Sequence, residues 1–180
     1  MTEKIKVLDK EFKISIHYNE IQKRVEELAK TIDNDLKSKD VIFLGILNGS
    51  FMFAADLFKN IKIDCQISFL KLASYQGTST TGKIKRLIGL NEDLKGKTVV
   101  ILEDIIDTGI TIENIIKQLK GYEPDEIKIS TLLFKPTAYQ KDIKIDYVGF
   151  EIPNDFILGY GLDYNGYARN LKHIYTLCNS

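Results

Sequence analysis

The chain has 180 residues, of which 44% are hydrophobic and 28% are charged, the proportions of a globular protein with an apolar core. These proportions exclude intrinsic disorder, and 12 glycines with 3 prolines exclude a collagen-like chain or a long linker. Basic and acidic residues number 25 each, so the formal net charge is zero, and we expect neither nucleic acid nor a membrane as a partner.

The sequence also predicts a cellular location. The N-terminal segment carries mixed charges without the apolar stretch of a secretory leader. No apolar run approaches the roughly 18 residues that cross a bilayer. Cys65 and Cys178 lie far apart and match no disulfide framework or zinc motif. We therefore expect a reduced, cytoplasmic protein.

The predicted elements alternate between helices and strands. Apolar residues recur every three or four positions between Asn19 and Leu36, which predicts an amphipathic helix whose capping box joins Asn19 and Gln22. The segment 41–47 is continuously apolar, as in parallel strands covered on both faces. Further helices are expected at 51–58 and 112–119, and further strands at 63–72, 83–90, 98–102, 126–134, 147–152 and 174–177. We expect the strand at 83–90 to run antiparallel to its predecessor. The alternation predicts one α/β domain around a mainly parallel sheet.

The stretch 74–82 is polar and has almost nothing to bury. Such a loop inside a compact domain is typical of a mobile, functional segment. Residues 77–84 nearly spell the phosphate-binding loop of nucleoside triphosphatases. However, Ile84 replaces the hydroxyl residue that binds magnesium there, and a strand follows where that motif needs a helix. We therefore reject an ATPase.

Three carboxylates, Glu103, Asp104 and Asp107, follow the buried strand at 98–102. Ligands of open α/β sheets bind beyond the carboxyl ends of the strands. Clustered carboxylates repel one another unless a cation or sugar hydroxyls engage them. The next residues, 108–111, supply two hydroxyls, a glycine and free backbone amides at a helix start, which suits a phosphate dianion. The alternative, solvated acids before a plain turn, is less consistent with the buried strand before them.

The segment 103–111, Glu-Asp-Ile-Ile-Asp-Thr-Gly-Ile-Thr, resembles the phosphoribosyl-pyrophosphate signature of the type I phosphoribosyltransferases, and its Glu-Asp start resembles their hypoxanthine–guanine branch. The resemblance continues through 47–52, 74–75, 135–136, 148–153, 159–165 and Arg169. It implies the type I phosphoribosyltransferase fold over residues 1–180. In that fold a core of about residues 18–150 holds a mainly parallel sheet flanked by helices. The two terminal segments form a small hood, and 74–82 form a flexible lid.

The resemblance also implies a reaction. The 5-phosphoribosyl group would pass from 5-phosphoribosyl 1-diphosphate (PRPP) to hypoxanthine, with guanine as a second acceptor, giving IMP or GMP and diphosphate. The implied cofactor is Mg²⁺. The implied partners are these small molecules and further copies of the chain in a homodimer or homotetramer.

Roles carry over to matching residues. Asp107 is implied as the catalytic base or acid at purine N7. The residues implied to hold the ribose and phosphate of PRPP are Glu103, Asp104, Asp107, Thr108, Gly109, Ile110 and Thr111. Those implied for pyrophosphate are Leu47, Asn48, Gly49 and Arg169, with a cis peptide between Leu47 and Asn48. Those implied for the purine are Lys135, Phe156, Ile157 and Asp163, those for magnesium are Glu103, Asp104 and Asp163, and those at the lid are Ser74 and Tyr75. Many relatives carry a lysine or arginine where this chain has Asn48, so one cation is missing from the implied pyrophosphate site.

Two alternatives stay open at this point. One is a regulator with the same fold that binds nucleic acid, but it would need a basic surface, whereas the chain is neutral. The other is a transferase that prefers xanthine or adenine, but Lys135 and Phe156 favour 6-oxopurines. The sequence does not decide between hypoxanthine and guanine. His17 and His173 lack metal-ligand spacing, and we expect them to be structural or exposed.

Overall fold

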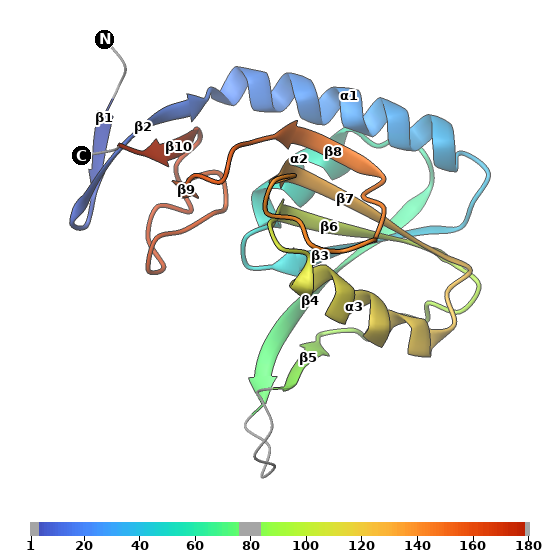
Figure 1. Ribbon diagram of the computed structural model, residues 1–180. Helices are drawn as coiled ribbons and strands as arrows, with labels where there is room; N and C mark the ends of the chain where they lie inside the picture. The colour runs from blue at the N-terminus through green and yellow to red at the C-terminus, as the bar shows by residue number, and fades with distance from the viewer. Residues whose placement is uncertain (1–3, 76–83, 179–180) are drawn as a thin grey trace.

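The computed structural model describes residues 4–75 and 84–178, which form two sheets (Figure 1). The six-stranded sheet has the order β5-β4-β3-β6-β7-β8, and the four-stranded sheet has the order β1-β2-β10-β9. The strands are β1 (Lys4–Val7), β2 (Lys10–Ile16), β3 (Val41–Leu47), β4 (Cys65–Tyr75), β5 (Ile84–Ile88), β6 (Thr98–Ile106), β7 (Glu126–Phe134), β8 (Tyr147–Glu151), β9 (Ile157–Leu158) and β10 (Ile174–Leu177). The helices are α1 (Tyr18–Leu36), α2 (Phe51–Asn60), α3 (Ile110–Leu119) and the 3₁₀ turn η1 (Lys120–Tyr122).

The six-stranded sheet is mainly parallel, as predicted. Strands β4, β3, β6, β7 and β8 pair in parallel, and β5 pairs antiparallel with β4. In the central strand β3, Val41 and Phe43 pack in the core that contains α1 and α2, whereas Ile42 and Leu44 pack in the core that contains α3. Helices on both faces therefore explain why β3 is continuously apolar.

Helix α1 is amphipathic, as its sequence predicts, but it begins differently. The helix starts at Tyr18, so His17 is the N-cap residue and its backbone N–H donates to Glu20 Oε2 at 3.0 Å. The predicted capping box of Asn19 and Gln22 is therefore wrong, because both residues already lie inside the helix. The side chain of Gln22 instead makes hydrogen bonds to residues outside α1. Among the described residues, no helix combines the length and apolarity required to cross a membrane.

The four-stranded sheet joins the two terminal regions of the chain. Strand β2 lies between β1 and β10, and β10 also pairs with β9. Phe12, Leu158 and Tyr175 form its small buried core. In Figure 1 this sheet lies beyond the carboxyl ends of β6, β7 and β8. His173 Nδ1 accepts a hydrogen bond of 2.9 Å from the backbone N–H of Tyr18 and so links this sheet to α1.

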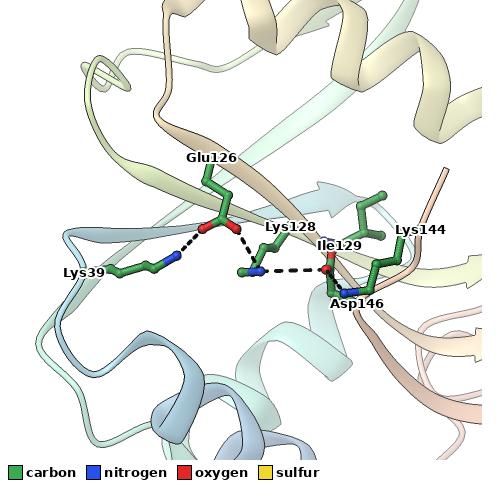
Figure 2. Close-up of polar contacts among 6 residues, drawn as sticks. All are labelled: Lys39, Glu126, Lys128, Ile129, Lys144 and Asp146. Atoms are coloured by element: carbon green, nitrogen blue, oxygen red, sulfur yellow. Dashed lines mark hydrogen bonds and ion pairs between the residues drawn. The ribbon is translucent and has the colours of Figure 1, made fainter.

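Opposite charges alternate at the amino ends of β3, β7 and β8 (Figure 2). The Glu126 carboxylate accepts hydrogen bonds from the ammonium groups of Lys39 and Lys128, the second at 2.9 Å. Asp146 lies 3.8 Å from Lys128 Nζ and 3.2 Å from Lys144 Nζ. This row of ion pairs ties together the strand ends that lie opposite the candidate site, so it has no part in forming that site.

Candidate active site

The loop after β3 packs tightly against the end of β6. The peptide bond between Leu47 and Asn48 is cis, as the family resemblance implied. A Cβ atom on Gly49 would lie 1.6 Å from Oδ2 of Asp104, so only glycine fits at this position. The backbone of the loop therefore lies directly against one of the predicted site acids.

A second backbone segment contacts the same loop. Gly161 has φ of +99°, and a Cβ atom there would lie 2.1 Å from the carbonyl oxygen of Gly49. The carbonyl oxygen of Gly161 accepts a hydrogen bond of 2.7 Å from Arg169 Nη1, and Arg169 Nη2 lies 2.5 Å from Asp163 Oδ1. The contacts of Gly161 thus bring Arg169 and the loop 47–49 into one cluster.

Two acids are buried side by side at the end of β6. Strand β6 continues to Ile106, so Glu103 and Asp104 lie within the strand and not after it, which corrects the predicted strand end. Glu103 is 6% exposed, and burial together with the charge of Asp104 raises its pKa well above the usual value. Burial also raises the pKa of Asp104, although Asp104 Oδ1 accepts a hydrogen bond of 2.9 Å from the backbone N–H of Ile105. Two adjacent buried acids favour a cation or hydroxyl donors beside them.

Glu103 and Asp104 supply only part of the ligand set of a magnesium ion. Among the described residues, no group of three or more histidines, cysteines, aspartates or glutamates can hold a metal ion. Asp163 does not gather with Glu103 and Asp104, because it is paired with Arg169 and accepts a hydrogen bond of 2.7 Å from the backbone N–H of Gly166. Mg²⁺ is commonly held by one or two carboxylates, water and substrate phosphates. Glu103 and Asp104 therefore suit an ion that arrives with a phosphorylated substrate.

The predicted phosphate loop lies at the N-terminus of α3. Gly109 is the N-cap residue with φ of +82°, and a Cβ atom there would lie 2.5 Å from the ring of Tyr139. The loop borders a cavity of about 220 Å³. Its lining residues are Glu103, Ile105, Ile106, Asp107, Thr108, Gly109, Thr111 and Ile112. Backbone amides at a helix start beside such a cavity suit a phosphate group.

Asp107 and Lys135 meet at the ends of neighbouring strands. Lys135 is only 7% exposed, and its Nζ lies 3.6 Å from Asp107 Oδ2. Its backbone N–H donates to the carbonyl oxygen of Ile106 at 3.0 Å, which fixes the lysine beside the end of β6. The Asp107 side chain is 46% exposed. A buried cation thus lies next to an accessible carboxylate that borders the cavity.

The predicted purine-stacking residue, Phe156, lies immediately before β9 of the four-stranded sheet. Phe156 is 44% exposed, and its ring meets those of Tyr164 and Phe12 at centroid distances of 5.6 Å and 6.2 Å. Lys10 Nζ lies 5.9 Å from its ring centroid. The neighbouring Ile157 is buried. Phe156 is therefore an exposed ring held by aromatic neighbours.

The remaining predicted residues are placed only in part. Ser74 and Tyr75 end β4, and their backbones pair with Lys85 and Ile84 of β5. Residues 76–82 of the predicted lid lie outside the described residues. His17 is exposed and His173 holds a backbone N–H, as we expected.

Sequence analysis missed several supporting contacts. The ring of Tyr139 limits the space at Gly109, and Gly161 packs against Gly49. Tyr160 is fully buried and bonded to Asp56. The spacing of Gly159 and Gly161 could have indicated a close backbone approach, but no sequence signal marks Tyr139 or Asp56 as parts of the site.

The fold and site define a class of α/β proteins that bind a phosphorylated ligand at the carboxyl ends of parallel strands. Comparison with known families makes this specific, because residues 17–165 match the model of the phosphoribosyl transferase domain. The chain belongs to the phosphoribosyltransferase family. Both the fold class and the family predicted from the sequence are confirmed.

Individual relatives share most of the chain. A hypoxanthine-guanine phosphoribosyltransferase of Staphylococcus epidermidis is 41% identical over 159 residues, covering 88% of this chain and 89% of the relative. A hypoxanthine phosphoribosyltransferase of Escherichia coli is 40% identical over 158 residues, covering 86% and 89%. The crystal structure of a hypoxanthine phosphoribosyltransferase from Staphylococcus aureus superposes with a TM-score of 0.84 at 37% identity and covers 92% of this chain and 90% of its own.

Proposed function

We propose that this phosphoribosyltransferase transfers the 5-phosphoribosyl group of PRPP to hypoxanthine, with guanine as a second acceptor, and releases diphosphate. The names of its relatives support this choice of substrates. The observation that carries the proposal is the contact of 3.6 Å between Lys135 and Asp107, because a 6-oxopurine presents O6 and N7 side by side on one edge. Lys135 donates to O6 and Asp107 faces N7. Adenine presents an amino group in place of O6, which a lysine donor does not match.

The other residues at this edge of the sheet hold PRPP. The amides and hydroxyls of residues 108–111 bind the 5-phosphate at the start of α3. The loop 47–49 and Arg169 bind the diphosphate. Glu103 and Asp104 bind the ribose hydroxyls, directly or through Mg²⁺. The tight contact between Gly49 and Asp104 supports this arrangement, because it makes the diphosphate and ribose positions neighbours.

The chemistry follows from where charge develops. As the bond at the anomeric carbon breaks, positive charge builds on the sugar and negative charge on the departing diphosphate. Mg²⁺, when bound, neutralises part of the diphosphate charge. Arg169 adds a fixed cation on the same side. Asp107 takes or returns the proton at purine N7 as the base or acid of the reaction.

The purine occupies the space between the two sheets. Phe156 stacks on the base with its exposed ring, and the backbone of Ile157 contacts the purine edge. Asp163 lies at the purine side of the site and faces the water shell of Mg²⁺. Its ion pair with Arg169 supports a position for Asp163 beside the diphosphate.

The proposal also covers the organisation of the chain. The core of about residues 18–150 carries the PRPP site, and the four-stranded sheet is a hood over it. The two free cysteines, Cys65 and Cys178, support a reducing cytoplasmic environment. The family implies a homodimer or homotetramer, which stays a prediction that light scattering tests.

A parallel kinetic assay tests the function. Diphosphate release is measured with PRPP, Mg²⁺ and, in turn, hypoxanthine, guanine, xanthine and adenine. We expect turnover with hypoxanthine and guanine and the least with adenine. Absence of PRPP-dependent turnover with every purine, together with salt-dependent retention of RNA or DNA, would instead support the nucleic-acid-binding regulator.

A further inference from the structure

A buried polar cluster joins α1, α2 and the turn that follows β9. Tyr160 is fully buried, and its hydroxyl donates to Asp56 Oδ2 at 2.6 Å. Gln22 Nε2 donates to the same oxygen at 2.7 Å, and Lys59 Nζ lies 2.6 Å from Asp56 Oδ1. Buried polar groups with matched partners hold their elements in one arrangement. This cluster therefore fixes the turn at Tyr160 to the two helices.

The turn fixed in this way carries the residues that meet the diphosphate loop. Gly161 follows Tyr160 directly and packs against the carbonyl oxygen of Gly49. Two hydrogen bonds join Arg169 to Gly161. Arg169 Nη1 donates to the carbonyl oxygen of Gly161 at 2.7 Å, and the backbone N–H of Gly161 donates to the carbonyl oxygen of Arg169 at 3.0 Å. Tyr160 also donates its backbone N–H to the carbonyl oxygen of Leu171 at 2.7 Å. Any displacement of Tyr160 thus moves Gly161 and Arg169 relative to the loop 47–49.

Asp56 connects the cluster to the same loop from the other side. Asp56 lies on α2, which begins at Phe51, immediately after the loop 47–49. The bond between Tyr160 and Asp56 therefore closes a ring of contacts that runs from the loop through α2 to Tyr160, and from Gly161 back to Gly49. None of the atoms in the bond borders the cavity lined by Asp107 and Thr108, so the bond acts through Gly161 and Arg169.

From this geometry we infer that Tyr160 is a positioning residue, whose hydrogen bond to Asp56 sets the affinity for the diphosphate part of PRPP more strongly than the affinity for the purine. The inference rests on the proposed function and extends it to residues outside the site. Lys135, which we assign to O6 of the purine, lies at the end of β7 and contacts Asp107. Phe156 precedes Tyr160 on the β9 segment, but its ring packs against Phe12 and Tyr164 and not against this cluster.

The protonation states of Asp56 and Tyr160 maintain the hydrogen bond between them. Burial works against the ionised form of Asp56, but the hydrogen bonds from Lys59, Tyr160 and Gln22 outweigh it and lower its pKa. Burial and the bond to Asp56 raise the pKa of Tyr160. The carboxylate therefore stays an acceptor and the hydroxyl a donor throughout the neutral range, so the positioning effect does not vary with pH there.

The variant Tyr160→Phe removes the hydroxyl and keeps the ring. A hydrogen bond to a charged group corresponds to roughly a tenfold change or more in an equilibrium constant, so we expect the KM for PRPP to rise about tenfold. We expect kcat to fall less than about threefold and the KM for hypoxanthine to rise much less than the KM for PRPP. Calorimetric titration of diphosphate with Mg²⁺ should show the same loss of affinity as the KM for PRPP.

Two further variants make the test decisive. Tyr147→Phe, in a second buried tyrosine at the start of β8, is the matched control and should leave both KM values unchanged. Gln22→Leu removes the second donor to Asp56 and should raise the KM for PRPP by a smaller factor than Tyr160→Phe. The inference is overturned if both variants of the cluster keep the wild-type KM for PRPP, or if the two substrates lose affinity equally. A wild-type protein without transferase activity would instead refute the proposed function.

Discussion

Replacing Gly49 with alanine should affect both stability and PRPP binding, because the structure leaves no room for a methyl group. The new Cβ atom would lie 1.6 Å from Asp104 Oδ2 and 2.4 Å from its Cγ. Asp104 cannot simply turn away, since its Oδ1 accepts a hydrogen bond of 2.9 Å from Ile105 and burial surrounds the carboxyl. Either the acid or the loop must move. Forcing a methyl group into a packed site typically costs about 1–3 kcal/mol.

The effect can be measured in two ways. For a chain of this size, 1 kcal/mol corresponds to about 2–4 °C in the melting temperature, so Gly49→Ala should lower it by roughly 2–12 °C. Displacement of a binding group by about 1 Å can cost on the order of 100-fold in activity. Calorimetry with PRPP and Mg²⁺ should therefore show at least a tenfold loss of affinity.

Gly121→Ala is the matched control. A Cβ atom at Gly121 has nothing within 4 Å, and the residue lies in the 3₁₀ turn η1, remote from the loop 47–49. A glycine-to-alanine change at a compatible position stabilises by about 0.4–1 kcal/mol through the unfolded chain. Equal melting temperatures and equal PRPP affinities for the two variants would refute the role that we assign to the contact between Gly49 and Asp104.

Three further predictions concern catalysis, the phosphate loop and pH. Asp107→Asn should lower kcat at least tenfold, toward the 10²–10⁴-fold range of a general base, while PRPP binding measured by calorimetry survives. The double variant Thr108→Val and Thr111→Val should weaken PRPP binding at least tenfold and purine binding little, because two hydrogen bonds to a charged phosphate are lost. Glu126→Gln should destabilise the fold at pH 7 by under about 1 kcal/mol, since its ion pairs are partly exposed. Hydrogen bonds from Lys39 and Lys128 lower the Glu126 pKa from 4.5, so this stabilisation is present above pH 4.5 and is lost as the pH falls below it.

Each of these three predictions has a result that contradicts it. Near-normal turnover in Asp107→Asn would remove its role at N7. Equal losses of PRPP and purine affinity in the double threonine variant would show that the hydroxyls do not face the phosphate alone. For Glu126→Gln, thermal unfolding is followed from pH 7 to pH 3, and a stability difference that persists unchanged at pH 3 would exclude the row of ion pairs in Figure 2 as its origin.

The apolar pattern of the chain was sufficient to predict the main sheet. The segment 41–47 is apolar at every position because helices cover both of its faces, and the structure places β3 at those residues. The prediction for 126–134 coincides with β7, whose apolar residues alternate with polar ones in its first half and are continuous from Leu132 to Phe134. The first two strands, 4–7 and 10–16, were not predicted. Their charged residues interrupt the apolar pattern, because the small sheet buries only a few side chains.

Local sequence patterns gave wrong or no predictions for residues whose contacts lie far away in the chain. Gln22 has the spacing of a capping residue after Asn19, yet its side chain binds Asp56 and Tyr160 inside the molecule. Asp56 and Tyr160 are 104 positions apart, and no local rule pairs them. Within the site, the acids and hydroxyls of 103–111 were recognisable because they adjoin one another in the sequence. The contact of Gly161 with Gly49 was not recognisable, since it depends on how two loops meet.

The crowding at Gly49 has a consequence for how the protein can be altered. In the half of the pocket assigned to PRPP, even a methyl group at Gly49 would collide with Asp104, and one at Gly161 would collide with the backbone of Gly49. The half assigned to the purine includes the exposed side chain of Phe156. Substitutions on the purine side can therefore change which base is accepted, whereas the packing at Gly49 and Gly161 keeps the choice of sugar donor fixed.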